Sequence, residues 1–412
     1  MNEHRVNKRK ILNDPVYGFI TLRYDILLDL IDHPYFQRLR RITQLGLSHL
    51  VYPGALHNRF HHAIGATFLM ANAIEVIRSK GHDITDDEAQ AAHIAILLHD
   101  IGHGPFSHAL EHSIVNDITH EDISSLMMER LNQEFNGQLS MAISIFKGQY
   151  HKPYLHQLVS SQLDMDRLDY LRRDSFYSGV TEGNVGSERI IKMLNVHEGQ
   201  LVVEEKGIYS IEKFIVARRL MYWQVYLHKT VLSAEYLLVN ILKRAKELTI
   251  KGTDLWCSPS LSRFLKNNYG KADFLETPEL LDTFARLDDF DILSAIKVWQ
   301  DHDDFVLSQL SEMLVKRKLF RIELRSESFP EERKLEIISR IQTKWKLSEA
   351  DAAYFFVSDS INNYAYSSAA ESIKIQYKNG EIRDAAEASD HFNLSALSKP
   401  VEKHFICYPR EL

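Results

Sequence analysis

An apolar helix that ends on a histidine and an aspartate constrains the fold of this chain more than any other feature. Residues 85–102 have the sequence TDDEAQAAHIAILLHDIG. The capping box that starts at Thr85 predicts the start of this helix, and Gly102 predicts its end. Its interior is almost wholly apolar, so the helix should be buried. Burying His99 and Asp100 together is costly unless a partner compensates them, and a bound cation would do so. The chain must therefore bring further ligands to this helix end.

Two other segments offer such ligands. His62 lies in HNRFHHAIG, one turn into a helix that Asn58 is expected to cap, and Asp166 lies in QLDMDRLDYLRRD. His61 is an alternative to His62 on spacing alone. Imidazole and carboxylate ligands suit a divalent transition metal, which leaves iron, manganese, zinc, cobalt and nickel open. An ion held by His62, His99, Asp100 and Asp166 would activate water and bind a phosphate oxygen.

Charge and cysteine content exclude some classes of protein. The 412-residue chain has a net charge of −7, which argues against a general nucleic-acid binder, so any phosphate site must be a local basic pocket. Two cysteines, Cys257 and Cys407, give no disulfide framework. The charged N-terminus does not resemble a signal peptide, and no apolar run approaches the ~18 residues of a membrane span. We therefore expect a cytoplasmic protein.

Hydrophobic periodicity predicts a mainly α-helical core with short β-hairpins and a smaller mixed α/β C-terminal region. We expect a domain over residues 1–250 and a second region over 251–412, a candidate for assembly. The expected helices cover about 25–44, 58–81, 85–101, 120–135, 139–147, 157–174 and 210–246. The expected hairpins lie at the N-terminus, at Glu198-Gly199 and at Asn379-Gly380, and strand-like runs occur at 352–359 and 403–409.

Several polar side chains near the predicted ligands suit proton transfer and phosphate binding. A histidine can protonate a leaving alkoxide, and a carboxylate such as Glu111, one turn from His108, would keep it charged. Arginine grips phosphate oxygens with two donors, and tyrosines cover a sugar or base. Taken singly, each of these residues is more often structural or surface-exposed than functional. The candidates are His103, His108, His120, Arg59, Arg167, Arg218, Tyr170, Tyr222 and Tyr226.

These segments together resemble the HD-domain phosphohydrolase superfamily, and more closely its deoxynucleoside triphosphate (dNTP) triphosphohydrolase branch. The resemblance extends over about residues 10 to 230, just over half of the chain. It rests on NDPVYGFI, HPYFQRLRRITQLG, PGALHNRFHHAIG, LLHDIGHGPFSH, THE and DMDRLDYLRRD.

The resemblance implies an HD-domain helical core and a role for each matching residue. The metal ligands would be His62, His99, Asp100 and Asp166. His108, supported by Glu111, would donate the proton, with His103 and His120 in the same pocket. Arg59, Arg167 and Arg218 would contact phosphates, and Gln44, Tyr170 and Asp174 would contact the sugar. Leu45 and Tyr226 would crowd the 2′ carbon and favour deoxyribose. The implied reaction releases a deoxynucleoside and triphosphate, with Mg²⁺ accompanying the nucleotide.

The resemblance also implies regulation and assembly. A guanine-nucleotide effector, GTP or dGTP, would bind at a subunit interface, and the chain would form a dimer or tetramer. The matching effector positions are Lys10, Asn13, Asp32, Gln37 and Arg40.

Two other functions remain open. The site could hydrolyse another nucleotide, such as a monophosphate, a cyclic nucleotide or (p)ppGpp. The cyclic-dinucleotide enzymes of this type have a Gly-Tyr-Pro signature, whereas this chain has Gly104-Pro105-Phe106. Alternatively, the protein could bind a nucleotide and report it by assembly, without turnover. Analysis of the products distinguishes these possibilities.

Overall fold

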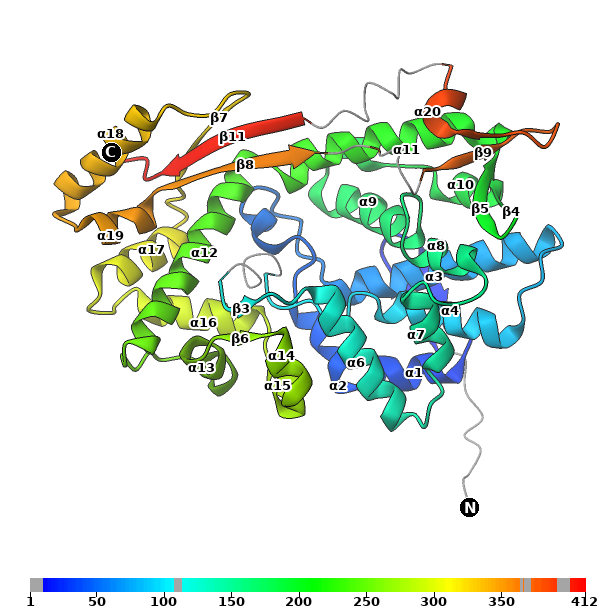
Figure 1. Cartoon of the computed structure of the whole chain (residues 1–412), viewed down its shortest axis with the longest axis horizontal. Helices are drawn as coiled ribbons and strands as arrows, with labels where there is room; N and C mark the ends of the chain where they lie inside the picture. Colours follow the sequence, from blue (N-terminus) through cyan, green and yellow to red (C-terminus); the bar gives the residue numbers. More distant parts are fainter. Residues whose placement is uncertain (1–9, 107–112, 364–365, 367–371, 391–400) are drawn as a thin grey trace.

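The computed structural model describes residues 10–106, 113–363, 366, 372–390 and 401–412. Helices dominate, and small sheets of two to four strands accompany them (Figure 1). This confirms the predicted mainly α fold with short hairpins. Buried apolar side chains form one continuous cluster that extends from β2 to β11. Residues 251–412 therefore pack onto the first part of the chain, and the division at residue 250 stays a prediction.

Three helices form the centre of the N-terminal part and position the predicted site. They are α3 (Arg59–Ser79), α4 (Asp86–Leu98) and α9 (Met165–Ser178), and α3 packs against both others. The side chains of Asn58 and Thr85 cap α3 and α4, as predicted. Around them lie α6 (His120–Glu134), α7 (Ser140–Phe146), α8 (Pro153–Val159) and α10 (Ser187–Met193).

Three of the predicted long helices are interrupted. The first divides into α1 (Asp25–Asp32), α2 (Pro34–Gln37) and the 3₁₀ helix η1 (Arg38–Arg41), because Pro34 lacks the amide that a continuous helix requires. The predicted helix over 157–174 breaks between α8 and α9, where Asp164 caps α9. The helix predicted from Ser210 divides into α11 (Ile208–Met221), a π-helical turn η5 (Tyr222–Tyr226) and α12 (Lys229–Ile250).

Hairpins form where the turn residues predicted them. The N-terminal hairpin pairs β1 (Ile11–Asp14) with β2 (Gly18–Thr21). β4 (Leu194–His197) pairs with β5 (Gln200–Glu204), and both residues of the turn between them, Glu198 and Gly199, have positive φ. The Asn379-Gly380 hairpin, β9 (Lys374–Gln376) and β10 (Ile382–Asp384), extends this sheet in the order β10-β9-β5-β4.

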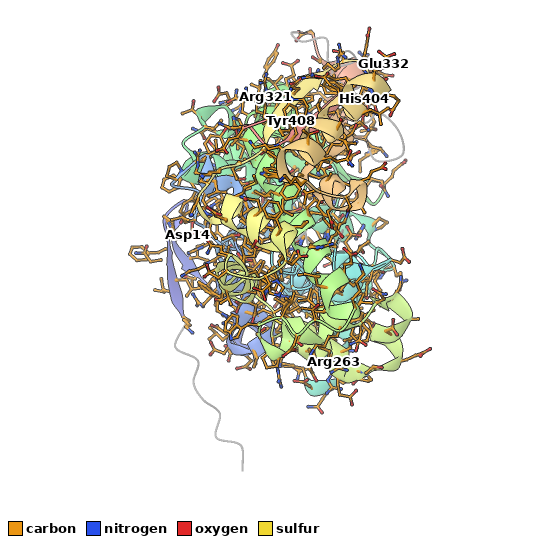
Figure 2. The ribbon with its side chains drawn as sticks, turned by 90° about the vertical axis from the view of Figure 1, so that its left-hand side faces the viewer. Asp14, Arg263, Arg321, Glu332, His404 and Tyr408 are labelled. Carbon is orange, nitrogen blue, oxygen red and sulfur yellow. The ribbon has the colours of Figure 1, made fainter. Side chains whose placement is uncertain are left out.

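The C-terminal part contains a three-stranded sheet with the order β7-β11-β8, whose strands are β7 (Arg321–Arg325), β11 (Val401–Tyr408) and β8 (Val357–Asn363). The strand predicted over 352–359 begins only at Val357, because Ala353–Phe355 forms a 3₁₀ turn. Figure 2 labels Arg321, His404 and Tyr408 on this sheet. The same part also contains α16 (Asp289–Trp299), α17 (Phe305–Val315) and α18 (Glu331–Trp345).

The shorter elements connect these parts. They are η2 (Gly46–Leu50), η3 (Thr181–Gly183), η4 (Glu205–Gly207), α13 (Pro259–Lys266), α14 (Lys271–Glu276), α15 (Pro278–Phe284), α19 (Glu349–Ala352), η6 (Ala353–Phe355), α20 (Ala385–Ala388), and β3 (Val115–Asn116) paired in parallel with β6 (Tyr269–Gly270).

One helix among the described residues, α3, is long and apolar enough to cross a membrane by length and composition, contrary to the prediction that no apolar run approaches that length. Within the protein, 72% of its most apolar stretch is buried. Alanines and a glycine allow α3 to pack closely against its neighbours, so its low polarity is explained by its central position.

Candidate metal centre and nucleotide pocket

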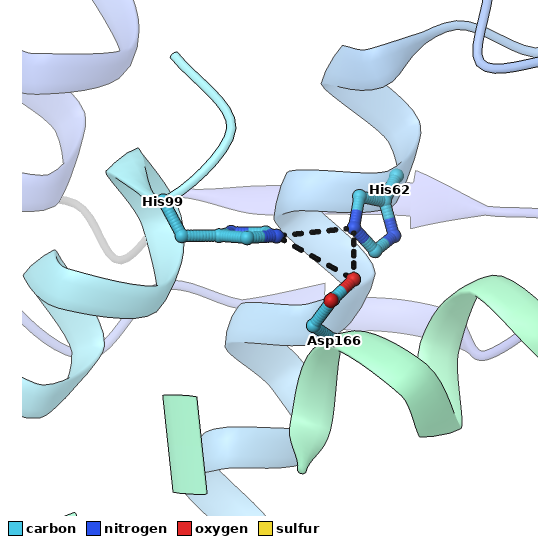
Figure 3. A group of neighbouring side chains, drawn as sticks. All are labelled: His62, His99 and Asp166. Atoms are coloured by element: carbon cyan, nitrogen blue, oxygen red, sulfur yellow. Dashed lines mark hydrogen bonds and ion pairs between the residues drawn. The ribbon is translucent and has the colours of Figure 1, made fainter. Parts of the chain in front are cut away.

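The structure brings three predicted ligands together from three separate elements (Figure 3). His62 lies in the first turn of α3, His99 directly follows α4, and Asp166 lies in the first turn of α9. Asp166 Oδ1 is 3.0 Å from His62 Nε2 and 3.5 Å from His99 Nε2, and the two Nε2 atoms are 3.3 Å apart. Ligand atoms that lie within 4.8 Å of one another can surround a single ion.

Hydrogen bonds fix the tautomers of both histidines. His99 Nδ1 is 2.6 Å from the carbonyl oxygen of Ile96, which can only accept, so Nδ1 must donate. His62 Nδ1 similarly faces Asp169 Oδ2 at 2.8 Å. In the neutral tautomer each Nε2 therefore presents a lone pair, and outer hydrogen bonds of this kind orient metal-ligating histidines. Two lone pairs and a carboxylate oxygen converge on one point, so these residues fit a divalent cation.

Asp100, the fourth predicted ligand, lies beside this cluster. Its Oδ1 is 3.4 Å from His99 Nε2 and 3.3 Å from His103 Nε2, and its Oδ2 is 3.8 Å from His62 Nε2. Arg59 donates from Nη1 to Oδ2 at 2.7 Å. Asp100 therefore connects the cluster to the arginine predicted to contact phosphate.

The cluster favours positive charge. Burial alone would lower the pKa of His62, but hydrogen bonds to Asp166 and Asp169 outweigh it and raise the pKa to about 10. Burial would raise the pKa of Asp166, but hydrogen bonds from His62 and His99 hold it below its usual value. The carboxylates thus create a potential that a bound cation would satisfy.

Neighbouring helices hold the turn that follows α4. Ser124 of α6 donates to the carbonyl oxygen of His99 and accepts from the amide of Gly102. A Cβ at Gly102 would lie 2.2 Å from the Ser124 amide nitrogen, so only glycine fits this approach. The buried guanidinium of Arg38 donates twice to the His103 carbonyl oxygen. These contacts give the backbone of the His-Asp doublet one defined position.

Two of the four residues predicted for proton transfer lie in the described part of the chain. The rings of His103 and His120 stack with centroids 3.8 Å apart. Burial and the charge of Arg59 lower the pKa of His103 to about 3. His103 is therefore neutral at pH 7. His108 and Glu111 lie outside the described residues.

The predicted sugar-binding residues form a connected wall beside Asp166. Tyr226 donates to Asp174 Oδ2 at 2.8 Å, and the rings of Tyr170 and Tyr226 meet edge to face at 6.0 Å. Burial raises the pKa of the Tyr170 phenol, and Asp166, Arg167 and Arg218 all lie within electrostatic reach of it. The π-helical turn η5 places Tyr222 and Tyr226 side by side on this wall.

Among the predicted substrate contacts, Gln44 Oε1 and Arg218 Nε are buried and have no hydrogen-bond partner in the described part of the chain. Such atoms cost about 1–3 kcal/mol unless a ligand or water satisfies them. Arg167, in contrast, already donates to the Ser161 carbonyl and to Asp164. Leu45 is partly buried at the start of η2. The backbone amide of Gln44 donates to the carbonyl oxygen of His57, and the side chain of His57 contacts Asp174 of the wall.

The five predicted effector residues include two pairs in contact. Lys10 Nζ lies 3.6 Å from Asp32 Oδ1, and Arg40 donates to Gln37 Oε1 at 3.0 Å. The Arg40 guanidinium also lies over the Phe60 ring. Asn13 is in β1, opposite Phe19.

Several residues that hold the site were not predicted from the sequence. Asp169 supports His62, and Arg173 and Asp14 follow it in a buried chain of ion pairs. His57 donates to Asp174 Oδ1 at 2.7 Å and stacks on Tyr177. The spacing of Asp166, Asp169 and Arg173 along α9 places them near one face, which was the available signal. No local pattern indicates Asp14 or His57.

Several known proteins resemble this chain, some of them over nearly its whole length. A phosphohydrolase from Bacteroides thetaiotaomicron has 55% sequence identity and a TM-score of 0.95, over 98% of this chain and all of that one. The uncharacterized protein YwfO of Bacillus subtilis is 31% identical, over 99% of this chain and 94% of YwfO. Human deoxynucleoside triphosphate triphosphohydrolase SAMHD1 is 30% identical, over 54% of this chain and 42% of SAMHD1. A family model described as HD associated region matches residues 185–257.

The metal-ligand geometry and these relatives agree. The chain belongs to the HD-domain phosphohydrolase superfamily, in the branch that includes the dNTP triphosphohydrolases.

Proposed function

We propose that this phosphohydrolase cleaves dNTPs to a deoxynucleoside and triphosphate. The observation that supports this most directly is the cluster of His62, His99 and Asp166 beside the wall that contains Tyr170 and Asp174. Arg218 lies within electrostatic reach of Tyr170 on that wall. A cation site next to arginine and tyrosine side chains suits a triphosphate that carries a sugar. The similarity to SAMHD1 adds support for this substrate class.

The proposed metal ligands are His62, His99, Asp100 and Asp166. A divalent transition ion held there would supply Lewis acidity toward a phosphate oxygen and would lower the pKa of water. The residues of the chain would supply the rest. Arg59 and Arg218 offset the charge of the triphosphate, and His108 donates a proton to the departing 5′-oxygen. The bond between that oxygen and the α-phosphorus breaks while water adds to phosphorus.

The wall also favours deoxyribose over ribose. Asp174 accepts from both His57 and Tyr226, so its carboxylate is fixed and still has lone pairs for a sugar 3′-hydroxyl. Because Tyr226 is tied to Asp174, its ring cannot swing away from the 2′ carbon without breaking that hydrogen bond. We propose that this fixed ring, with Leu45, excludes a 2′-hydroxyl.

Assembly and location follow as further proposals. We infer a cytoplasmic homo-oligomer, dimeric or tetrameric, that a guanine nucleotide activates through Lys10, Asn13, Asp32, Gln37 and Arg40. Both cysteines are free, which suits a reducing compartment. Mg²⁺ would accompany the bound nucleotides.

A panel of the four dNTPs with Mn²⁺, with and without GTP, tests the proposal. Release of deoxynucleoside and triphosphate in equal amounts is the expected result. Release of orthophosphate would instead indicate another phosphohydrolase reaction. Nucleotide binding without turnover under every condition would indicate a sensor.

A further inference from the structure

We propose that Asp14, on the N-terminal hairpin, is a positioning residue for the metal ligand His62 and acts through Arg173 and Asp169. The inference rests on the metal site of the proposed function, but it does not depend on the identity of the substrate. It links a β-hairpin at the edge of the protein to the metal centre inside it. Figure 2 labels Asp14 on this hairpin.

Four side chains from three elements form the link. Asp14 at the end of β1 accepts from Arg173 Nη1 at 2.8 Å. Arg173 on α9 donates from Nε and Nη2 to the two oxygens of Asp169, at 2.9 and 3.0 Å. Asp169 Oδ2 accepts in turn from His62 Nδ1 at 2.8 Å. The remaining nitrogen of His62, Nε2, faces Asp166 and His99.

The link is buried along its whole length. The side chains of Arg173, Asp169 and His62 have no measurable exposure, and that of Asp14 is 4% exposed. In this environment Asp169 accepts from Nε and Nη2 of Arg173, and Asp14 accepts from Nη1. Loss of Asp14 would leave a buried N–H donor without this acceptor, which is costly. Arg173 therefore depends on Asp14 for the position from which it holds Asp169.

Close packing of two helices is a condition for this link. A Cβ at Gly65 of α3 would lie 2.1 Å from both Arg173 Nη2 and Asp169 Oδ1. The absence of a side chain there allows the guanidinium–carboxylate pair to lie directly against α3. Because both atoms are already held by ion pairs, neither can move aside cheaply. The position of the Arg173–Asp169 pair against α3 is thus determined by the close approach of the backbone as well as by charge.

The two oxygens of Asp14 have separate roles. Oδ1 accepts from the amides of Val16 and Tyr17, both at 2.9 Å, and shapes the hairpin turn. Oδ2 binds Arg173. An asparagine at this position would keep an acceptor for the turn but would replace the oxygen that accepts from Arg173 by an NH2 group that cannot accept. The Asp14→Asn variant therefore separates hairpin formation from the link to the metal.

This arrangement couples the hairpin to metal affinity. The strand that ends at Asp14 also contains Asn13, so contacts made to the hairpin act on the position of Asp14. Thermodynamic coupling between two sites is reciprocal. If an intact hairpin with Asp14 in place raises the affinity for the metal, then bound metal must stabilise the hairpin. The hairpin should therefore open less often when the metal site is filled.

The test measures metal affinity without any nucleotide. Metal-free wild-type protein and Asp14→Asn are titrated with Co²⁺, and the bound fraction is read from the visible absorption of the ion. Loss of an outer partner of a metal ligand typically costs about 10- to 100-fold in affinity. We expect about tenfold for Asp14→Asn, because it lies two contacts beyond the outer partner Asp169. Asp14→Glu, which retains the charge, should recover part of the affinity.

A matched control removes a comparable charge far from the site. Asp304 caps α17 and pairs with Arg244 at 2.6 Å, and both side chains are mostly buried. Asp304→Asn retains the capping acceptor and should bind Co²⁺ as the wild type does. Equal Co²⁺ affinity in Asp14→Asn and the control would overturn the proposal.

A second measurement uses only the wild type, so it remains informative if Asp14→Asn does not fold. Hydrogen exchange of the amides of residues 11–21 is compared with and without Co²⁺. Slower exchange with Co²⁺ supports the link, and unchanged exchange in protein that binds Co²⁺ overturns it. Loss of affinity in Asp14→Asn, together with no dNTP turnover by the metal-loaded wild type, would retain this inference and reject the proposed substrate.

Discussion

The Nε2 atoms of His62 and His99 lie 3.3 Å apart, and both rings use Nδ1 for another hydrogen bond. Two neutral imidazoles in this arrangement point lone pairs at each other, which is unfavourable unless a positive charge lies between them. A proton can join only two of these groups in one hydrogen bond, whereas a divalent ion can bind both nitrogens and Asp166 at once. This relationship underlies the predictions that concern the metal.

Replacing His99 and Asp100 together by alanine should abolish metal content and turnover at once. The double substitution removes His99, one of the three converging ligands, and the carboxylate of Asp100 beside them. Metal content by mass spectrometry and triphosphate release are measured on the same samples. Wild-type turnover in this variant would contradict the assignment of the site.

Metal binding should stabilise the folded protein, because these ligands converge only in the native state. At a free ion concentration of 100 times the dissociation constant, the gain is about 2.7 kcal/mol. Urea unfolding with and without Mn²⁺ measures it. In His62→Ala the gain should disappear; an undiminished gain would place the stabilising ion elsewhere.

His108→Ala should retain the metal and lose most of the turnover. The residue is predicted to protonate the leaving oxygen, and general acid catalysis typically contributes about 10²- to 10⁴-fold to a rate. Metal analysis beside single-turnover kinetics tests this. Loss of the ion in this variant would instead make His108 a ligand.

His57→Phe should raise the KM for dNTPs about tenfold while the metal content stays unchanged. Phenylalanine preserves the stack on Tyr177 but removes the hydrogen bond to Asp174. One lost hydrogen bond to a charged group is worth about 1.5–3 kcal/mol. If His57 acts through Asp174 on the 3′-hydroxyl, the penalty should vanish with 2′,3′-dideoxynucleotides. The same penalty with both substrates would show a general loss of packing.

The stability of the fold should depend on pH through Asp289. This buried carboxyl accepts from the amide and hydroxyl of Thr43 and from the amide of Phe106, and burial raises its pKa from 3.8 to about 6. Between these values the folded state retains the proton and the unfolded state loses it. The contribution of protonated Asp289 to the free energy of unfolding is therefore fully present below pH 4 and is lost as pH rises through about 6. The difference in unfolding free energy between wild type and Asp289→Asn, measured from pH 4 to 7, should follow this course. A pH-independent difference would contradict the raised pKa.

The sequence predicted the parts of the fold that local chemistry determines. Asn58 and Thr85 cap α3 and α4 through their own side chains, and glycine turns define the hairpins, so these features are visible in short windows. The helix breaks at Asp164 and at the π-helical turn near Tyr222 were not predicted, because the apolar periodicity of the sequence continues across them. Packing against neighbouring helices decides those positions.

Some residues of the candidate site were likewise predicted from local sequence, and others were not. His62, His99 and Asp166 were predicted because their residue types reveal their chemistry, and their convergence agrees with the resemblance. Asp14 and His57 were not predicted, since an acid in a hairpin turn and a histidine in a loop have many ordinary roles. Their partners, Arg173 and Asp174, lie more than 100 positions away in the chain. Only tertiary structure reveals such contacts.

Gly65 binds nothing and has no functional group, so any inventory of reactive side chains overlooks it. A single methyl group there would collide with two atoms whose positions are fixed by charge, and α9 would have to move outward with Asp166 on its first turn. The ion would then lose one ligand through a change that touches no ligand. Among natural variants of this protein, position 65 should tolerate replacement as poorly as the histidines themselves.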